Sequence, residues 1–389
     1  MMSQPIPKKI KTNNPDFGLK TFNTLLVDGS NIMEVAFNAD KTISSNGKIT
    51  GPIFQFLLQI KLLLKKANFR YVYVFWDGDN SGFFRFLMNE QYKSNRDKTY
   101  ENEVSEGLSD YMKEYNATLK RMQNYIFNKR NKEKSDEQKK NKEIFFEQRE
   151  IIMNCLEELF VRQVLCDKVE ADDLIAYYVN NKKPNERIVI MSNDRDLTQL
   201  IADDVIIYIQ QKKMFINKKN HTEEIGYYYE NVLLKKILCG DSSDSIKGIK
   251  GFGEITLLNN FPEIKTRKVT LEEVIEKAKK INDKRIIEKK KPLQWAKNIV
   301  DRVTTGAQGD KIYEINKKII DLKNPLMTDE AKELMDSMMY SPLDSEGRSY
   351  ENLYKILCDA GIDDLIDPNR FSNFFIEYSY LIEKEKKNC

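Results

Sequence analysis

YVYVFWDG, at residues 71–78, is the stretch that decides the fold, because its apolar residues follow one another without alternation and end in an aspartate. Two further runs have the same form, TLLVDG at 24–29 and RIVIMSND at 187–194. Near-continuous hydrophobicity over this length is typical of strands buried on both faces of a parallel sheet. Helical patterns lie between the runs, at 52–66 and after Val169. We therefore predict an α/β domain whose mostly parallel central sheet is flanked by helices.

Each of the three runs ends in an acidic residue, namely Asp28, Asp77 and Asp194. In open α/β sheets, ligands bind beyond the carboxyl ends of the strands, so acids at three such ends are expected to share one site. A single aspartate at a strand end is more often a turn or helix-cap residue. The same residue type at all three ends favours the shared site.

Six more acidic residues extend this set: Glu170, Asp172 and Asp173 in VEADDLIAYY, Asp196 in SNDRDL, and Asp241 and Asp244 in GDSSD. The spacing of Asp241 and Asp244 predicts that both lie on one face of a helix. Two carboxylates about 4 Å apart repel each other by roughly 4 kcal/mol at an effective dielectric constant near 20. Converging acids therefore require bound cations or raised pKa values, and oxygen ligands without histidine or cysteine favour Mg²⁺ or Mn²⁺ over zinc. Taken one by one, acids in the first turn of a helix only complement its dipole.

The composition excludes several other kinds of site. The 389 residues carry a formal net charge of only +3, and the five scattered cysteines without CxxC spacing argue against a disulfide framework or a zinc site. The single histidine, His221, excludes a histidine-based triad, and its polar surroundings NKKNHTEE predict a solvated loop. The N-terminal segment reads as a polar lead-in without a secretion signal, and the run at 53–64 is too short to span a bilayer, so we expect a cytoplasmic protein.

Two segments carry residues suited to binding phosphate. IKGIKGFGEITLL (246–258) has the layout of a helix, a glycine turn and a helix, with backbone amides available to a phosphate or a monovalent cation. GFFRFLMNEQYKSNRDK (82–98) follows Asp77 and adds basic residues and an aromatic ring. The alternatives are a tight interhelical turn for the first segment and ordinary amphipathic helix residues for the second. Lysine-rich sequence over 97–165 predicts either a solvated helical pair or a partly disordered insertion.

Together and in this order, the motifs VDGSN, FWDGD, YKSNRD, VEADD, SNDRD, and GDSSD followed by GIKGFG resemble those of the flap endonuclease/5′ nuclease superfamily. They are most similar to the ribonuclease H-type 5′ nucleases of tailed bacteriophages, and the resemblance covers about residues 22–260. It implies a PIN-like nuclease core over 21–215, after a flexible lead-in at 1–20, with a helical arch inserted at 97–165. It further implies a helical C-terminal region over 216–389, with a helix-three-turn-helix DNA-binding module at 232–261 and a basic insertion at 262–312.

The resemblance implies a structure-specific hydrolase, a 5′-3′ exonuclease and flap endonuclease with ribonuclease H-type activity. Such an enzyme removes RNA primers and 5′ flaps during DNA replication and leaves 5′ phosphates. The implied cofactors are two or three Mg²⁺ ions, with Mn²⁺ as a substitute, and K⁺ at the glycine hairpin. The implied partners are duplex DNA or an RNA/DNA hybrid with a 5′ end or flap, and a single-strand-binding protein or sliding clamp. A monomer without a membrane partner is expected, in the host cytoplasm if a phage encodes it.

The site residues follow from the resemblance position by position. The implied metal ligands are Asp28, Asp77, Glu170, Asp172, Asp173, Asp194, Asp196, Asp241 and Asp244. We assign Asp28, Asp77, Glu170 and Asp172 to one ion and the other five acids to a second or third. The implied catalytic residues are Lys93, Asp28, Asp77 and Asp172. The implied DNA-binding residues are Arg85, Tyr92, Lys93, Arg96, Lys247, Gly248, Lys250, Gly251 and Gly253. The alternative is a catalytically silent scaffold that only binds junctions, and the complete acidic set argues against it, because carboxylates repel phosphates.

Overall fold

The computed structural model describes residues 18–44, 47–89, 92–93, 136–302, 310–344, 346–362 and 367–388. Arg96 and residues 97–135, which make up most of the predicted arch, lie outside these ranges. None of the described helices is long and apolar enough to cross a membrane.

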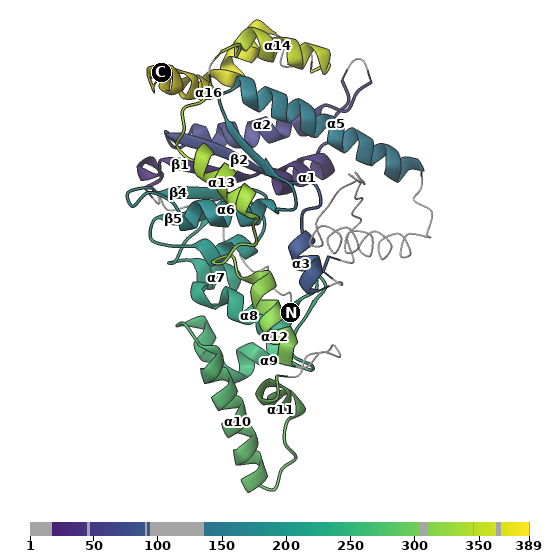
Figure 1. Ribbon diagram of the computed structural model, residues 1–389, viewed down its shortest axis with the longest axis vertical. Helices are drawn as coiled ribbons and strands as arrows, with labels where there is room; N and C mark the ends of the chain where they lie inside the picture. Colours follow the sequence, from purple (N-terminus) through teal and green to yellow (C-terminus); the bar gives the residue numbers. More distant parts are fainter. Residues whose placement is uncertain are drawn as a thin grey trace, which may run out of the picture.

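A six-stranded sheet forms the centre of the upper part of the molecule (Figure 1). Its order is β3-β2-β1-β4-β5-β6, and all neighbours are parallel except the antiparallel pair β5–β6. The strands are β1 (Thr24–Asp28), β2 (Tyr71–Asp77), β3 (Arg162–Cys166), β4 (Ile188–Met191), β5 (Val205–Ile209) and β6 (Met214–Ile216). The three predicted runs are β1, β2 and β4, which are adjacent and parallel, so the predicted mostly parallel sheet is confirmed.

Helices cover both faces of this sheet because successive strand residues point in opposite directions. Leu25 and Val27 face a core built from helices α1 (Gly29–Ala39), α2 (Gly51–Leu64), α5 (Asp136–Glu158), α14 (Tyr350–Asp359) and α16 (Pro368–Asn388). Leu26 faces the other core, with helices α6 (Ala171–Asn180) and α13 (Asp329–Met338). Helices α13, α14 and α16 thus complete the nuclease core, so the predicted domain boundary at 215/216 misplaces them.

The predicted arch also extends too far along the chain. Residues 162–166 form β3 at the edge of the sheet, paired with β2. The second half of α5 packs into the core through Ile152, Cys155 and Leu156, all fully buried. The many charged residues of α5 made this apolar stripe hard to recognise in the sequence. The arch prediction is wrong from about residue 150 onward.

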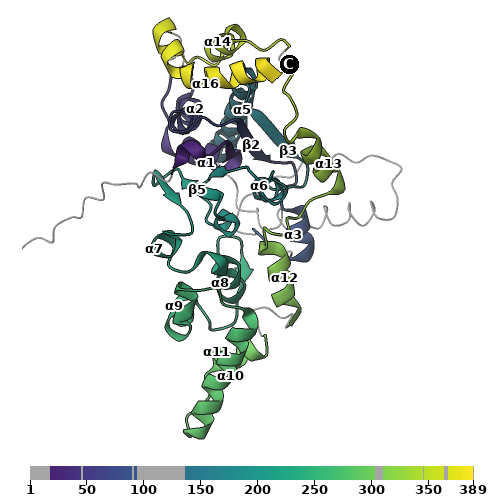
Figure 2. The same cartoon turned by 90° about the vertical axis from the view of Figure 1, so that its left-hand side faces the viewer.

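The lower part of the molecule is a helical module with its own core (Figure 2). It contains helices α8 (Val232–Cys239), α9 (Glu254–Asn260), α10 (Leu271–Ile287), α11 (Gln294–Val300) and α12 (Asp310–Ile320). Phe252, Phe261 and Trp295 stack edge to face or tilted at its centre. The remaining helices among the described residues are α3 (Phe83–Met88), α7 (His221–Ile225), and short 3-10 turns at Leu19–Thr21, Asp196–Leu200, Tyr229–Asn231 and Pro262–Lys265.

A two-stranded hairpin of β7 (Gly240–Asp241) and β8 (Ile246–Lys247) separates α8 from α9. Asp241 and Asp244 therefore do not lie on one helical face, and that prediction is wrong. The physical reason is a pair of glycines: a Cβ on Gly240 would lie 2.4 Å from the amide nitrogen of Gly248. Gly240 also has φ 75°, a conformation that ends the helix at Cys239.

His221 is buried as the first residue of α7, which contradicts the predicted solvated loop. Its Nδ1 lies 2.7 Å from the carbonyl oxygen of Tyr227, and burial lowers the pKa of the imidazole. The polar residues around it hid this burial, because the ring packs against Tyr227 and Tyr229, which follow later in the chain.

Candidate metal centre

The first acidic group lies at the start of α6. Glu170 occupies the N-cap position, and Asp172 and Asp173 lie in the first turn. The three side chains offer carboxylate oxygens within 4.8 Å of one another. The end of β2 fixes this helix start, because Asp77 Oδ1 accepts a hydrogen bond of 2.9 Å from the Ala171 amide.

Arg85, on α3, lies buried among these acids. Its guanidinium forms a bidentate pair with Asp173, contacts Glu170 Oε2 at 2.9 Å and donates from Nε to the Ile319 carbonyl at 2.9 Å. The carboxylates outweigh the opposing effect of burial and raise the pKa of Arg85, so it remains a cation. Asp173 also accepts a hydrogen bond of 3.0 Å from the Leu326 amide. Arg85 thus joins α3, α6 and α12 into one unit.

Asp172 is the member of this group that the protein leaves unsatisfied. Its Oδ1 is buried and accepts no hydrogen bond among the described residues, and Arg85 Nη2 lies 3.8 Å away from it. Burial raises the pKa of Asp172 well above its ordinary value, Arg85 lowers it, and Asp173 raises it further. A buried carboxylate oxygen without a donor suits a ligand to a cation.

The second acidic group comprises Asp196, Asp241 and Asp244, whose oxygens also approach within 4.8 Å. Lys236 of α8 forms ion pairs with both Asp196 and Asp241. Burial and then Asp194 raise the pKa of Asp196 to about 7, against the effect of Lys236. Burial opposes ionisation of Asp241 as well, but Lys236 and Ser243 hold its pKa down at about 2.

The strand-end acids adjoin these groups. Asp28 caps α1 by accepting from the Asn31 amide at 3.1 Å and also accepts from Ser192 Oγ at 2.8 Å. Ser192 Oγ in turn accepts from the amide of Asp194, at 3.0 Å. Burial, and after it the charge of Asp77, raises the pKa of Asp28 to about 7. A raised carboxyl pKa of this kind is expected where several carboxylates lie close together.

Lys93 links the two groups. Its Nζ pairs with Glu170, while its amide donates to the Asp244 carbonyl at 2.8 Å. The backbone of Lys93 is left-handed (φ 49°), a strained conformation for lysine that the amide hydrogen bond helps to hold. Burial alone would lower the pKa of Lys93, but Glu170 and then Asp244 raise it instead.

These contacts bring six of the nine predicted acids together in two groups of three, with Asp28, Asp77 and Asp194 next to them, and the grouping differs from the prediction in one respect. Asp173 belongs with Glu170 and Asp172 rather than with the second group. The donors are oxygens only, which suits hard divalent cations, and the Oδ1 of Asp172, which accepts no hydrogen bond from the described residues, fits such an ion. The side chains present therefore fit divalent metal binding.

Apart from Arg96, which lies outside the described residues, the expected DNA-binding residues differ in their exposure. Arg85 and Tyr92 are buried, and the Tyr92 hydroxyl donates to Glu170 Oε2 at 2.9 Å, so neither side chain is presented for DNA contact. Lys247 and Lys250 are exposed at the glycine turn. The glycines differ in the same way: Gly248 is buried against the Cys239 backbone, whereas nothing lies within 4 Å of a Cβ on Gly251 or Gly253. Only part of the predicted set is therefore open to a large ligand.

Sequence reasoning missed three features of this region. The sequence does not indicate a role for Lys236, because its acidic partners lie in other motifs, although it precedes Asp241 by only five residues. Two buried asparagines support the glycine turn: Asn298 of α11 donates to the Lys250 carbonyl at 2.8 Å, and Asn316 of α12 donates to the Lys247 carbonyl at 2.7 Å. No sequence pattern marked either asparagine.

Known nucleases resemble this chain in sequence. Residues 23–226 match the family described as 5′-3′ exonuclease, N-terminal resolvase-like domain. A 5′-3′ exonuclease of Mycoplasmopsis pulmonis is 27% identical over 251 residues, which cover 64% of this chain and 69% of that protein. A 5′-3′ exonuclease of Buchnera aphidicola subsp. Acyrthosiphon pisum is 25% identical over 287 residues, covering 72% of this chain and 80% of that one.

Solved structures show the same fold. The 5′-exonuclease of bacteriophage T5 with bound divalent metal ions (zinc) superimposes with a TM-score of 0.54 at 18% identity, covering 87% of this chain and 98% of that one. The T5 flap endonuclease in complex with DNA and metal ions gives the same TM-score and identity, and covers 87% of this chain and 99% of that one. The expected PIN-like α/β 5′ nuclease fold is therefore confirmed. With the family matched over residues 23–226, the chain belongs to the 5′-3′ exonuclease family and is a nuclease that hydrolyses phosphodiester bonds.

Proposed function

We propose that this 5′ nuclease is structure-specific and depends on divalent metal ions, with 5′ flaps and RNA primers on duplex DNA as its substrates. The observation that carries the proposal is the juxtaposition of nine carboxylates with an exposed, lysine-bearing glycine turn. Asp241 and Asp244 belong to the acidic centre, and Lys247 follows only three residues later. A ligand held at the turn is thus close to the centre.

Mg²⁺ is the proposed ion, held on one side by Glu170 and Asp172 with Asp28 and Asp77, and on the other by Asp196, Asp241 and Asp244 with Asp194. When bound, such ions lower the pKa of water and neutralise charge on a phosphate. Lys93 lies between the two groups, where its ammonium can stabilise negative charge that develops on the scissile phosphate. Asp173 positions Arg85 and α6, and its oxygens are engaged in that pair.

The glycine turn is the proposed grip on the duplex. Gly251 has φ 77° and open space around it, so a phosphate or a K⁺ ion can approach its backbone closely. Asn298 and Asn316 hold the two lysine carbonyls of the turn in place. Lys247 and Lys250 then add counterion-releasing contacts to the DNA backbone.

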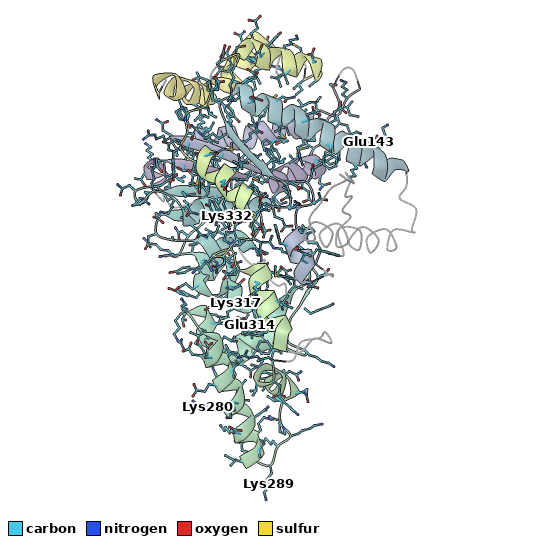
Figure 3. The ribbon with its side chains drawn as sticks, viewed as in Figure 1. Glu143, Lys280, Lys289, Glu314, Lys317 and Lys332 are labelled. Carbon is cyan, nitrogen blue, oxygen red and sulfur yellow. The ribbon has the colours of Figure 1, made fainter. Side chains whose placement is uncertain are left out.

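The basic helices beyond the turn are proposed to extend this grip along the duplex. Residues 265–302 carry thirteen lysines and arginines against six acidic residues, in a chain whose net charge is only +3. Lys280 and Lys289 point away from the module, at the side of α10 and at its tip (Figure 3). Because α10 has 17 residues, it is about 25 Å long, which equals roughly seven base pairs of B-form DNA.

The proposed experiment compares product lengths from three 5′-labelled substrates of the same sequence: a 5′ flap, a nicked duplex and an RNA-primed duplex. Each is incubated with Mg²⁺, with Mn²⁺, and with EDTA. The proposal expects cleavage near the junction of the flap substrate and release of ribonucleotides from the primer, with none in EDTA. Cleavage that starts from 3′ ends, or that continues in EDTA, would contradict it.

A further inference from the structure

Helix α12 lies between the upper and lower parts of the molecule. It packs against α3 and α8, and Figures 1 and 2 both show it below α3 and beside α8. Ile319 and Ile320, at its C-terminal end, belong to a small separate core. This core also contains Tyr92, whose hydroxyl contacts the first acidic group, and Ile246 of β8. The helix therefore contacts elements that carry different parts of the site.

The end of α12 holds residues from the segments of both acidic groups. The last carbonyls of a helix have no partner inside it, so other groups can donate to them. The Ile319 carbonyl accepts a hydrogen bond of 2.9 Å from Arg85 Nε, and Arg85 pairs with the first acidic group. The next carbonyl, that of Ile320, accepts one of 3.1 Å from Gln199 Nε2. Gln199 lies in the same 3-10 turn as Asp196, a member of the second group.

Asn316 connects the same helix to the glycine turn. Its side-chain amide donates to the Lys247 carbonyl at 2.7 Å, and the residue is 1% exposed. Asn316 precedes Ile319 by three residues, which is about 5 Å along a helix. Close-packed protein interiors are hardly compressible and transmit displacements. A shift of the Lys247 carbonyl when a duplex binds is therefore passed on to the end of α12.

We propose that α12, through Asn316 and Gln199, couples the binding of duplex at the glycine turn to the positioning of the two acidic groups. The coupling rests on the proposed function and adds the residues that make cleavage depend on a correctly held duplex. Binding energy from a part of the substrate that does not react raises the rate when it positions the reacting groups. Lys93 also joins the two acidic groups, so loss of the α12 contacts should slow cleavage without abolishing it.

The alternative is that Asn316 only supports the turn, as Asn298 does. Both side chains are buried, and both donate to a carbonyl of the same turn, at 2.7 Å and 2.8 Å respectively. They differ in their helices: Asn298 belongs to α11, which packs against α10, whereas Asn316 belongs to the helix whose end contacts Arg85. The two asparagines are thus a matched pair, and coupling through α12 predicts different kinetic effects for them.

The test measures the maximal single-turnover rate of 5′-flap cleavage in Mg²⁺ and the enzyme concentration that gives half of that rate. Asn316→Ala is expected to lower the maximal rate about tenfold, the factor for one hydrogen bond, and to raise the half-saturating concentration less than about threefold. Asn298→Ala is expected to raise the half-saturating concentration severalfold with a smaller change in maximal rate. Asn180→Ala should match the wild type, because Asn180 also donates to a backbone carbonyl, that of Lys323 at 3.1 Å, but is exposed at the end of α6 far from the acids.

Gln199→Met tests the contact at the end of the helix, and it decides the question even if Asn316→Ala fails to fold. Gln199 Oε1 accepts no hydrogen bond from the described residues, so the substitution mainly removes the bond to the Ile320 carbonyl. The maximal rate is expected to fall about threefold to tenfold at an unchanged half-saturating concentration. The double variant should lose less than the product of the two single losses, because both bonds act through one helix.

Three results would overturn the coupling. The first is that Asn316→Ala raises only the half-saturating concentration, as expected for Asn298→Ala. The second is a wild-type maximal rate for Gln199→Met, and the third is a double variant in which the two losses multiply. Failure of the wild type to cut the flap in Mg²⁺ would instead refute the proposed function.

Discussion

Arg85→Met tests the role that the structure gives to this arginine, as the cation that holds the first acidic group together. Arg85 contacts Asp173 in bidentate fashion, Glu170 at 2.9 Å and the Ile319 carbonyl at 2.9 Å, and it is 4% exposed. Methionine fills a similar volume without charge. The variant therefore removes one cation from a buried network and leaves its acceptors behind.

The size of the effect follows from this geometry. Breaking a buried ion pair by removing one partner costs about 3–5 kcal/mol, because the remaining charge is uncompensated. Asp173 keeps only the Leu326 amide as a described donor. We expect the free energy of unfolding at pH 7.5 to fall by about 3–5 kcal/mol, and Arg85→Lys to lose less.

The effect has a defined pH dependence. The pKa of Asp173 is already raised by burial, and losing Arg85 raises it further. A carboxyl group with a raised pKa in the folded state binds more protons than in the unfolded state, so the variant loses stability as the pH rises above about 4. The deficit relative to the wild type should accordingly be smaller at pH 5 than at pH 7.5, because Asp173 is protonated to a greater extent at the lower pH.

Equilibrium urea unfolding of the metal-free proteins at pH 5 and 7.5, followed by circular dichroism, measures both quantities. The control is Arg267→Met, which breaks the exposed pair with Glu273 and should cost less than about 1 kcal/mol at either pH. A loss below about 1 kcal/mol for Arg85→Met, or a loss that does not change with pH, would refute the reasoning.

Three further predictions concern the same centre. Lys236→Met leaves the second acidic group without its cation, so it should lower metal-free stability by about 2–4 kcal/mol and increase the rise in melting temperature on adding Mg²⁺. The metal-free wild type should lose up to about 4 kcal/mol of its free energy of unfolding between pH 4 and pH 7, because the folded-state pKa of Asp28 is about 7 instead of 3.8. Urea unfolding in EDTA measures this loss, and adding Mg²⁺ should reverse the decrease of stability with rising pH. Asn298→Ala frees the Lys250 carbonyl and should raise KM for duplex substrates severalfold while kcat changes less, as steady-state cleavage assays would show.

The strands that were predicted and those that were missed differ in how they are buried. TLLVD, YVYVFWD and IVIM are central strands without polar interruption, which is why continuity alone identified them. β3 (RQVLC) lies at the sheet edge and alternates between buried and partly exposed residues, so its signal was diluted. β5 (VIIYI) is fully buried and carries the same signal as the three predicted runs. The same argument therefore predicts β5 as a strand as well.

The convergence of the acids was predictable because strand ends in a parallel sheet must meet at one edge. The basic residues that pair with these acids were not predictable, because nothing in the local sequence relates Lys236 to Asp196, or Arg85 to Asp173. The glycine turn shows the same limit. Gly248 and Gly251 look alike in sequence, yet the first packs closely against the backbone of a preceding helix end, whereas the space around the second is open.

The most direct test of the metal centre is the single-turnover rate of 5′-flap cleavage by Asp172→Asn across a Mg²⁺ titration. The substitution keeps the shape of the side chain and removes the charge from a carboxylate that has a buried oxygen without a described donor. Asp329→Asn is the control, because Asp329 also lies in the first turn of a helix but is exposed. The account predicts that Asp172→Asn loses at least about a thousandfold in rate at saturating Mg²⁺, equal to roughly 4 kcal/mol, with Asp329→Asn unchanged. Cleavage by Asp172→Asn at the wild-type rate would contradict it.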